Sequence, residues 1–172
     1  MVSQAKRRAA RELALQMLFA VDVGRVPLRE VLVSFMWDQE SPSNEMIQDP
    51  EVQDYARQLV RGTAVRVRQI DKVLASRAEG WDLERLANVD RNLLRMATYE
   101  MMLGPEMPEG VVINEAVDLA KMYSTEESGK FVNGLLGTLS RERPAVMVEL
   151  EAEETDGQDE SGSSGGTPVP EG

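Results

Sequence analysis

The sequence predicts an all-α fold, a compact body of about seven helices followed by a disordered acidic C-terminal tail. Apolar residues recur at three- and four-residue steps through most of the chain, which is the period of an amphipathic helix. No stretch shows the alternation of Val, Ile and Thr between hairpin turns that is typical of β-strands. From about residue 145 the chain becomes acidic and rich in Gly, Ser and Pro, a composition that buries too little apolar surface to fold.

The helices of the first half begin at residues that favour a helix N-terminus. Ser3 is the expected N-cap of the first helix. Pro27 opens the second helix, because its fixed φ suits the first helical turn. Asp49 caps a long third helix that Pro50 starts and that extends to about Leu74.

The second half contains a shorter set of helices. We expect a short helix over 83–87 and a longer one over 89–103. Two amphipathic helices then cover 111–123 and 130–136, and a polar turn of residues 124–129 joins them.

The charge of the chain is unevenly distributed. The 172 residues carry a net charge of −11, with 30 acids against 19 bases. The segment 145–172 holds eight acids and no base, so the remaining 22 acids leave residues 1–144 with a net charge of only −3. A nucleic acid responds to local fields within a Debye length of about 8–10 Å, so the acidic total does not exclude such a partner.

The residue types that most enzymes need are missing from the sequence. The chain has no His and no Cys, which removes the commonest general base, the usual activator of a nucleophile and thiolate chemistry. Gly129-Lys130 resembles part of a phosphate-binding loop, but the leading glycine is absent and Phe131 stands where Ser or Thr is required. The sequence therefore predicts a protein that is not an enzyme and has no metal site and no cofactor.

Targeting signals are also missing from the sequence. No apolar run approaches the roughly 18–20 residues that span a bilayer, and the N-terminus lacks a secretory apolar segment. We expect a cytoplasmic protein. For the acidic tail, two interpretations stay open: a solubilising segment, or a decoy that competes with RNA for the protein's own basic surface.

Basic and polar side chains gather at two places. In the polar turn and the helices beside it, we expect Lys121, Ser128, Lys130 and Asn133 to lie close together, as a docking point for a phosphate backbone. At the start of the chain, the helical rotation places arginines on the side opposite the apolar stripe. Cations there oppose the helix dipole by roughly a few tenths of a kcal/mol each, which suggests anion binding; a solvated helix end is the alternative.

Three collinear segments resemble the NusB family, the small helical RNA-binding factors of bacterial transcription antitermination. The first is the arginine-rich opening 7–19, the second is the central run 89–100, and the third is the pair of helices over 111–136. The resemblance covers nearly all of residues 3–140. Ala9 and Gly129 depart from the family pattern.

The resemblance implies a fold and a set of partners. It implies a helical RNA-binding domain over 1–144, built as two small helical bundles of about residues 3–78 and 82–141, with the tail over 145–172. It implies binding of the single-stranded boxA element of nascent ribosomal RNA jointly with NusE, a ribosomal protein of the small subunit. Other Nus factors and RNA polymerase would join the assembled complex, and the free protein could be a monomer or a homodimer.

The resemblance also assigns residues to the two interfaces. The implied RNA surface consists of Arg7, Arg8, Arg11, Lys121, Ser128, Lys130, Phe131 and Asn133. The implied NusE surface consists of Asp90 and Glu100, with Glu127 nearby. For Phe131 two interpretations stay open, since its helical spacing with Leu135 is typical of a core residue, and its place beside Lys130 suits a base-stacking plane.

Two other binding functions compete with this one. A DNA-binding helix–turn–helix over residues 112–123 and 128–140 would have a recognition helix that becomes apolar after Phe131, which is poor for reading base edges. A non-catalytic RNA- or protein-binding scaffold related to the front domain of ribosomal RNA methyltransferases is the other alternative. The chain is too short to include the methyltransferase domain itself.

Overall fold

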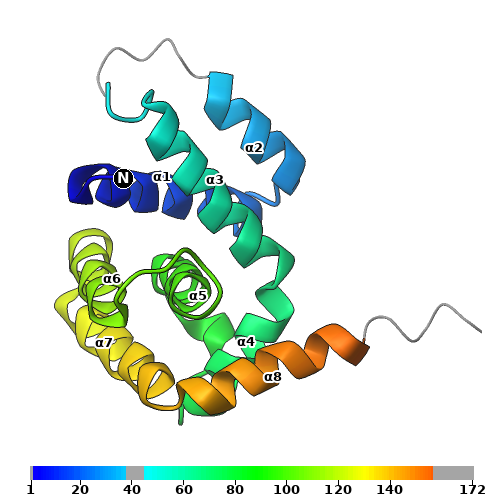
Figure 1. Cartoon of the computed structure of the whole chain (residues 1–172). Helices are drawn as coiled ribbons and strands as arrows, with labels where there is room; N and C mark the ends of the chain where they lie inside the picture. The colour runs from blue at the N-terminus through cyan, green and yellow to red at the C-terminus, as the bar shows by residue number, and fades with distance from the viewer. Residues whose placement is uncertain (1, 38–44, 157–172) are drawn as a thin grey trace, which may run out of the picture.

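Helices account for the architecture of this chain, as the sequence predicts. The computed structural model describes residues 2–37 and 45–156, and these residues contain no β-strand. They form eight α-helices, against the expected seven or so, and one 3-10 helix: α1 Gln4–Asp22, α2 Leu28–Trp37, α3 Pro50–Val65, α4 Val67–Arg77, η1 Leu83–Arg85, α5 Asn88–Met102, α6 Glu109–Tyr123, α7 Glu126–Arg141 and α8 Arg143–Asp156. Figure 1 shows their arrangement.

Helix α5 lies at the centre of the structure (Figure 1). It packs against α1, α3, α4, α6 and α7, while α1, α2 and α3 pack together on one side of it and α6 pairs with α7 on the other. One continuous hydrophobic core runs through these groups, from Ala10 in α1 to Leu150 in α8. Because the core is shared, the division into two bundles of residues 3–78 and 82–141 stays a prediction.

The predicted caps of the first-half helices are confirmed. The side chain of Ser3 accepts a hydrogen bond from the backbone N–H of Lys6 at 3.3 Å. Asp49 accepts one from the backbone N–H of Glu51 at 2.9 Å, and Pro50 occupies the first turn of α3. These contacts satisfy donors that the helix itself leaves unpaired.

The long helix expected from Pro50 to Leu74 is divided in the structure. Arg66 leaves helical geometry, with φ −108° and ψ 16°, and separates α3 from α4. The β-branched residues Val65 and Val67 flank it, and such side chains lower helix propensity. The apolar repeat continues across the break, so the sequence pattern alone does not reveal it.

Helix α7 begins earlier than the sequence predicts. The polar turn expected over 124–129 is limited to Ser124 and Thr125, because Thr125 is the N-cap of α7 and accepts from the backbone N–H of Ser128 at 3.0 Å. Glu126 and Glu127 occupy the first turn, where carboxylates interact favourably with the helix dipole.

Helix α8 corrects the boundary that we placed at residue 144. The tail was expected to start at residue 145, but the chain continues as a helix to Asp156 and packs against α4. Val146 and Leu150, one turn apart, are buried, and Arg77 of α4 forms a paired hydrogen bond with Glu149. The bond from Arg77 lowers the pKa of Glu149. Residues 157–172, the rest of the expected tail, lie outside the described residues.

Truncating Leu150 tests whether α8 is part of the folded body. We expect Leu150→Ala to lower the free energy of unfolding by about 2–4 kcal/mol, because it leaves a cavity against α4. Val148, on the exposed side of the same helix, is the matched control, and Val148→Ala should change stability by less than about 0.5 kcal/mol. Urea unfolding followed by circular dichroism measures both. Equal effects of the two substitutions would show that α8 does not dock.

Candidate nucleic-acid interface

At the corner between α6 and α7, the hydroxyl groups of Ser124, Thr125 and Ser128 hydrogen-bond to one another. The Ser128 hydroxyl lies 2.9 Å from that of Ser124 and 3.0 Å from that of Thr125. It donates a hydrogen bond to Oδ2 of Asp90, at the start of α5, at 2.7 Å. Ser128, which we expected to contact RNA, is therefore half-buried and holds α7 against α5. Asp90, expected on the NusE surface, is only 6% exposed.

The aliphatic stem of Lys121 lies over Gly129. A Cβ atom at position 129 would stand 2.7 Å from Cγ of Lys121, so a side chain there would displace the lysine. The Lys121 side chain as a whole remains exposed, and its ammonium nitrogen lies 3.9 Å from a carboxylate oxygen of Glu126. The departure from the family pattern at Gly129 thus has a local reason, since the missing side chain lets Lys121 reach across the corner.

The outer side of α7 presents the remaining corner residues to solvent. Glu127, Lys130 and Asn133 are exposed, and they follow one another at three-residue steps, which places them on one helical side. Among the described residues Lys130 forms no ion pair. It is therefore a cation available to an external anion.

Phe131 packs against Trp81, a residue that the sequence analysis did not select. Their ring centroids lie 5.0 Å apart with the planes tilted by 48°. Phe131 is half-buried, whereas Trp81 is 60% exposed. Lys130 and Gly134 line the same hollow, of about 450 Å³. The sequence did contain a signal for this site. Trp81 stands between Gly80 and Asp82, outside any helical apolar repeat, so its side chain is not needed for the core of a helix.

The basic start of α1 is largely neutralised by neighbouring carboxylates. The guanidinium of Arg8 contacts Glu12 at 3.2 Å and Glu115 of α6 at 3.0 Å, and Asp118 lies 3.9 Å away. Burial alone would lower the pKa of Arg8, but its bonds to Glu115 and Glu12 raise it above its usual value. Arg7 is half-buried.

Arg11 and Glu100 are interior residues, which corrects two of our expectations. Each is 2% exposed, and the guanidinium of Arg11 donates to both carboxylate oxygens of Glu100, with the shortest distance 2.7 Å. The Tyr55 hydroxyl of α3 donates to the same carboxylate at 2.5 Å. Burial and the charge of Glu100 raise the pKa of Tyr55, so this hydroxyl stays protonated. Arg11 therefore does not face RNA, and Glu100 does not face a protein partner.

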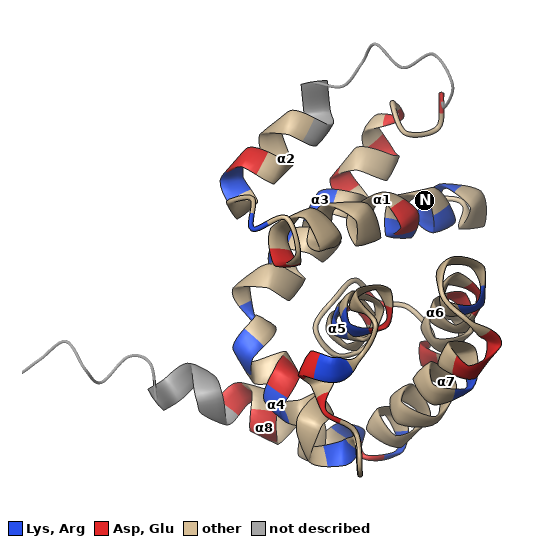
Figure 2. Ribbon diagram, turned by 180° about the vertical axis from the view of Figure 1, so that it is seen from behind, with Lys and Arg blue, Asp and Glu red and all other residues tan. Residues whose placement is uncertain are grey.

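The two basic regions are neighbours, but they do not form a continuous cationic surface. The bond between Arg8 and Glu115 places the start of α1 beside α6, as the prediction of a joint cradle requires. Glu115 and Asp118, however, precede Lys121 on the same helix and contact Arg8. Figure 2 shows acidic and basic segments side by side on α1, α6 and α7.

An apolar groove beside the corner is a second feature that the sequence analysis did not identify as a site. Leu15 and Phe19 of α1, Val89 of α5 and Tyr123 of α6 line a groove of about 250 Å³. Phe19 is 39% and Tyr123 is 47% exposed. Leu15 and Phe19 are visible in the sequence as apolar residues of the first helix, but only the fold brings Val89 and Tyr123 beside them.

The described residues offer no inorganic site and no membrane-spanning segment. Within 2–37 and 45–156, no three His, Cys, Asp or Glu side chains are grouped so as to hold a metal ion. In the same residues, none of the helices is long and apolar enough to cross a bilayer.

These features define a small helical protein with a candidate binding surface of exposed aromatic, cationic and amide side chains. Residues 8–141 match the model of the NusB family, so the chain belongs to that family. The chain is 43% identical over 145 residues to the transcription antitermination protein NusB of Streptomyces avermitilis, which covers 84% of this chain and 98% of that protein. It is 44% identical over 134 residues to NusB of Sorangium cellulosum, covering 78% and 91% respectively.

Solved structures show the same fold. The structure of T. maritima NusB superimposes with a TM-score of 0.70 at 35% identity and covers 83% of this chain and 94% of that one. A crystal structure of antitermination factors NusB and NusE in complex with double-stranded RNA superimposes with a TM-score of 0.67 at 25% identity, covering 85% and 98% respectively.

Replacing Arg11 tests its interior role. Arg11→Met leaves the Glu100 carboxylate buried without a countercharge, and we expect the free energy of unfolding to fall by about 3–5 kcal/mol. Arg7→Met, one turn earlier, should cost less than about 1 kcal/mol because it leaves no buried charge unpaired. Urea unfolding at neutral pH measures both. A small loss for Arg11→Met would contradict the interior assignment.

Proposed function

We propose that the chain is a non-catalytic transcription antitermination factor that binds the boxA element of nascent ribosomal RNA jointly with NusE. It would help assemble the antitermination complex, with other Nus factors, on RNA polymerase in the cytoplasm. Membership of the NusB family supports this proposal, as do the relatives that carry the antitermination name. The neighbouring structure that holds NusB, NusE and RNA supports the choice of partners.

One observation carries the RNA-binding part of the proposal: the exposed Trp81 ring beside Phe131, with Lys130 free of an ion pair among the residues that the structure describes. An exposed tryptophan leaves a large apolar surface in water, and a stacked base would cover it. Single-stranded RNA is bound through stacking on aromatic rings, worth ~1–3 kcal/mol per base, and through cations on its phosphates. Trp81 would supply the ring on which a base stacks, Phe131 would hold that ring through their contact, and Lys130 would contact a phosphate.

The other proposed RNA contacts surround this centre. Lys121 and Asn133 would contact phosphates or sugars from the exposed side of the corner, and Arg7 from the start of α1. Arg8 would contribute only by exchanging Glu115 for a phosphate. Ser128 and Arg11 would act indirectly, because their bonds within the protein hold α7 and α1 in place.

The NusE surface is proposed at the start of α5. Glu127 is exposed and precedes Ser128, which donates to Asp90. Asp90 would act by holding Ser128, because it is itself buried. The apolar groove of Phe19 and Tyr123 includes Val89, the residue before Asp90, so it offers an apolar centre to the same partner. Glu100 would contribute only through Arg11, because it is buried.

Two alternatives are tested by the same binding measurements. A scaffold related to the front domain of ribosomal RNA methyltransferases would use the apolar groove but would not depend on Lys130. A DNA-binding helix–turn–helix would use α7 as its recognition helix. Val132 and Leu136 of α7 are fully buried, which leaves a single side of the helix for base contacts.

Titration of a labelled boxA-type RNA, with and without NusE, tests the proposed function. If Arg7, Lys121 and Lys130 each neutralise one phosphate, log K should fall with log[salt] at a slope of about −2, from ~0.7 per contact. Lys130→Ala should make the slope shallower by about 0.7 and weaken binding. A slope near zero, or equal binding of a matched DNA duplex, would contradict a single-stranded RNA site.

Removing the Trp81 ring tests the stacking plane directly. Trp81→Ala should weaken binding of single-stranded RNA by about 1–3 kcal/mol, whereas Trp81→Phe should retain most of the affinity. The same RNA in a duplex should bind both variants alike, since its bases are not free to stack. Unchanged affinity of Trp81→Ala for single-stranded RNA would show that the ring has no stacking role.

A further inference from the structure

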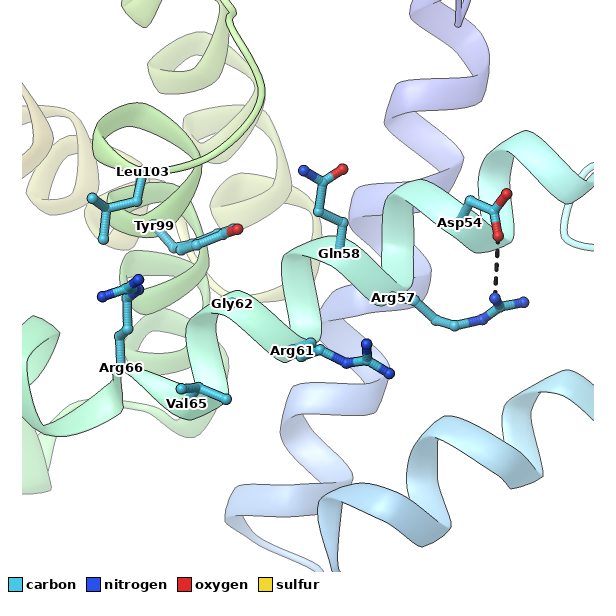
Figure 3. Close-up of a pocket in the computed structure, with 9 residues that line it drawn as sticks. All are labelled: Asp54, Arg57, Gln58, Arg61, Gly62, Val65, Arg66, Tyr99 and Leu103. Atoms are coloured by element: carbon cyan, nitrogen blue, oxygen red, sulfur yellow. Dashed lines mark hydrogen bonds and ion pairs between the residues drawn. The ribbon is translucent and has the colours of Figure 1, made fainter.

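A groove between α3 and the end of α5 has the chemistry of a second phosphate-binding surface. Its volume is about 540 Å³. Its cationic wall comes from Arg57, Arg61 and Arg66, and Asp54 is the only carboxylate among the residues that line it. Figure 3 shows Arg57 and Arg61 extending side by side from α3 and Arg66 reaching toward Leu103.

Arg57 and Arg61 lie about one turn apart on α3, and Arg66 follows directly after the end of the helix. Along the helix axis Arg57 and Arg61 are about 6 Å apart, at ~1.5 Å per residue. Arg61 is exposed and forms no ion pair among the described residues, and Arg57 is bound only to Asp54, three residues before it. Guanidinium groups bind phosphate oxygens through paired hydrogen bonds, so this row suits successive phosphates of one strand.

The floor of the groove suits the rest of a nucleotide. The Tyr99 ring of α5 lies so close to Gly62 that a Cβ atom there would overlap it, which explains the glycine in this turn of α3. Val65 is 69% exposed at the end of the groove. Gln58 points toward Tyr99 (Figure 3), and neither side chain makes a hydrogen bond among the described residues.

The groove is separate from the corner described above. Asp90 lies in the first turn of α5, whereas Tyr99 and the C-cap residue Leu103 lie about 14 Å and about 20 Å farther along the helix axis, at ~1.5 Å per residue. Helix α1 contacts an element of each site, since Lys6 pairs with Glu51 of α3 and Arg8 pairs with Glu115 of α6.

We propose that the groove of Arg57, Arg61 and Arg66 binds the phosphate backbone of a second RNA segment, several nucleotides beyond the one at the corner. This inference rests on the proposed function. Single-stranded RNA is favoured over an acidic peptide because the groove combines guanidinium groups with a phenol, an amide and an exposed apolar side chain. A nucleotide matches all of these with its phosphate, ribose hydroxyls and base.

The test compares two labelled RNAs, a short one of about 12 nucleotides and the same RNA extended to about 30. The extended RNA should bind the wild-type chain more tightly. The double variant Arg57→Ala, Arg61→Ala should lose roughly tenfold in affinity for the extended RNA, with a salt slope shallower by about 1.4, and should bind the short RNA unchanged. Arg29→Ala on α2, an exposed arginine outside the groove, is the control and should change neither.

The outcomes separate this inference from the proposed function. Equal binding of the extended RNA by the double variant and the wild type, at equal melting temperature, would overturn the groove assignment. So would stronger competition for the groove by a glutamate-rich peptide than by the RNA extension. Failure of the proposed function would instead appear as no binding of the short RNA by the wild type, or as no effect of Lys130→Ala on that binding.

Discussion

The buried contact of Arg11 with Glu100 determines how the helices of this chain meet. Removing both charges from water costs several kcal/mol per ion, and this is offset only if their hydrogen bonds are nearly complete. The two bonds from Arg11 and the one from Tyr55 meet that requirement, so α1, α3 and α5 must approach one another in a single register. An apolar contact would tolerate a slip along the helices that this directional contact does not.

The position of α1 then decides what each neighbouring surface can do. With Arg11 directed inward, Arg8 one turn earlier is directed to α6 and meets Glu115 and Asp118. The two carboxylates therefore separate the cations of the corner, Lys121 and Lys130, from the arginines of α1. Central helix α5 has the corner at its first turn and the arginine groove at its last, so it separates two surfaces of similar chemistry.

The C-terminal helix extends the body beyond the part that matches the family model, which ends at residue 141. Its buried side covers α4 through Val146 and Leu150, and its Glu149 pairs with Arg77. Arg77 lines the hollow of Trp81 and Phe131, and Glu142 also lies within 3.6 Å of it. This arginine is thus neutralised within the protein, which leaves Lys130 as the cation of that hollow free of an ion pair among the described residues.

The sequence by itself determined the all-helical class, the caps at Ser3 and Asp49 and the exposed cations of the corner, because helical periodicity and capping are local properties. Only the tertiary structure decided which arginines are available. Arg8 and Arg11 carry the same charge on the same helix, and their environments differ because carboxylates about 90 to 110 residues later in the chain come to lie beside them. The sites at Trp81 and at the arginine groove could also be recognised only in the fold. The first brings Trp81 beside Phe131, and the second brings α3 beside the end of α5.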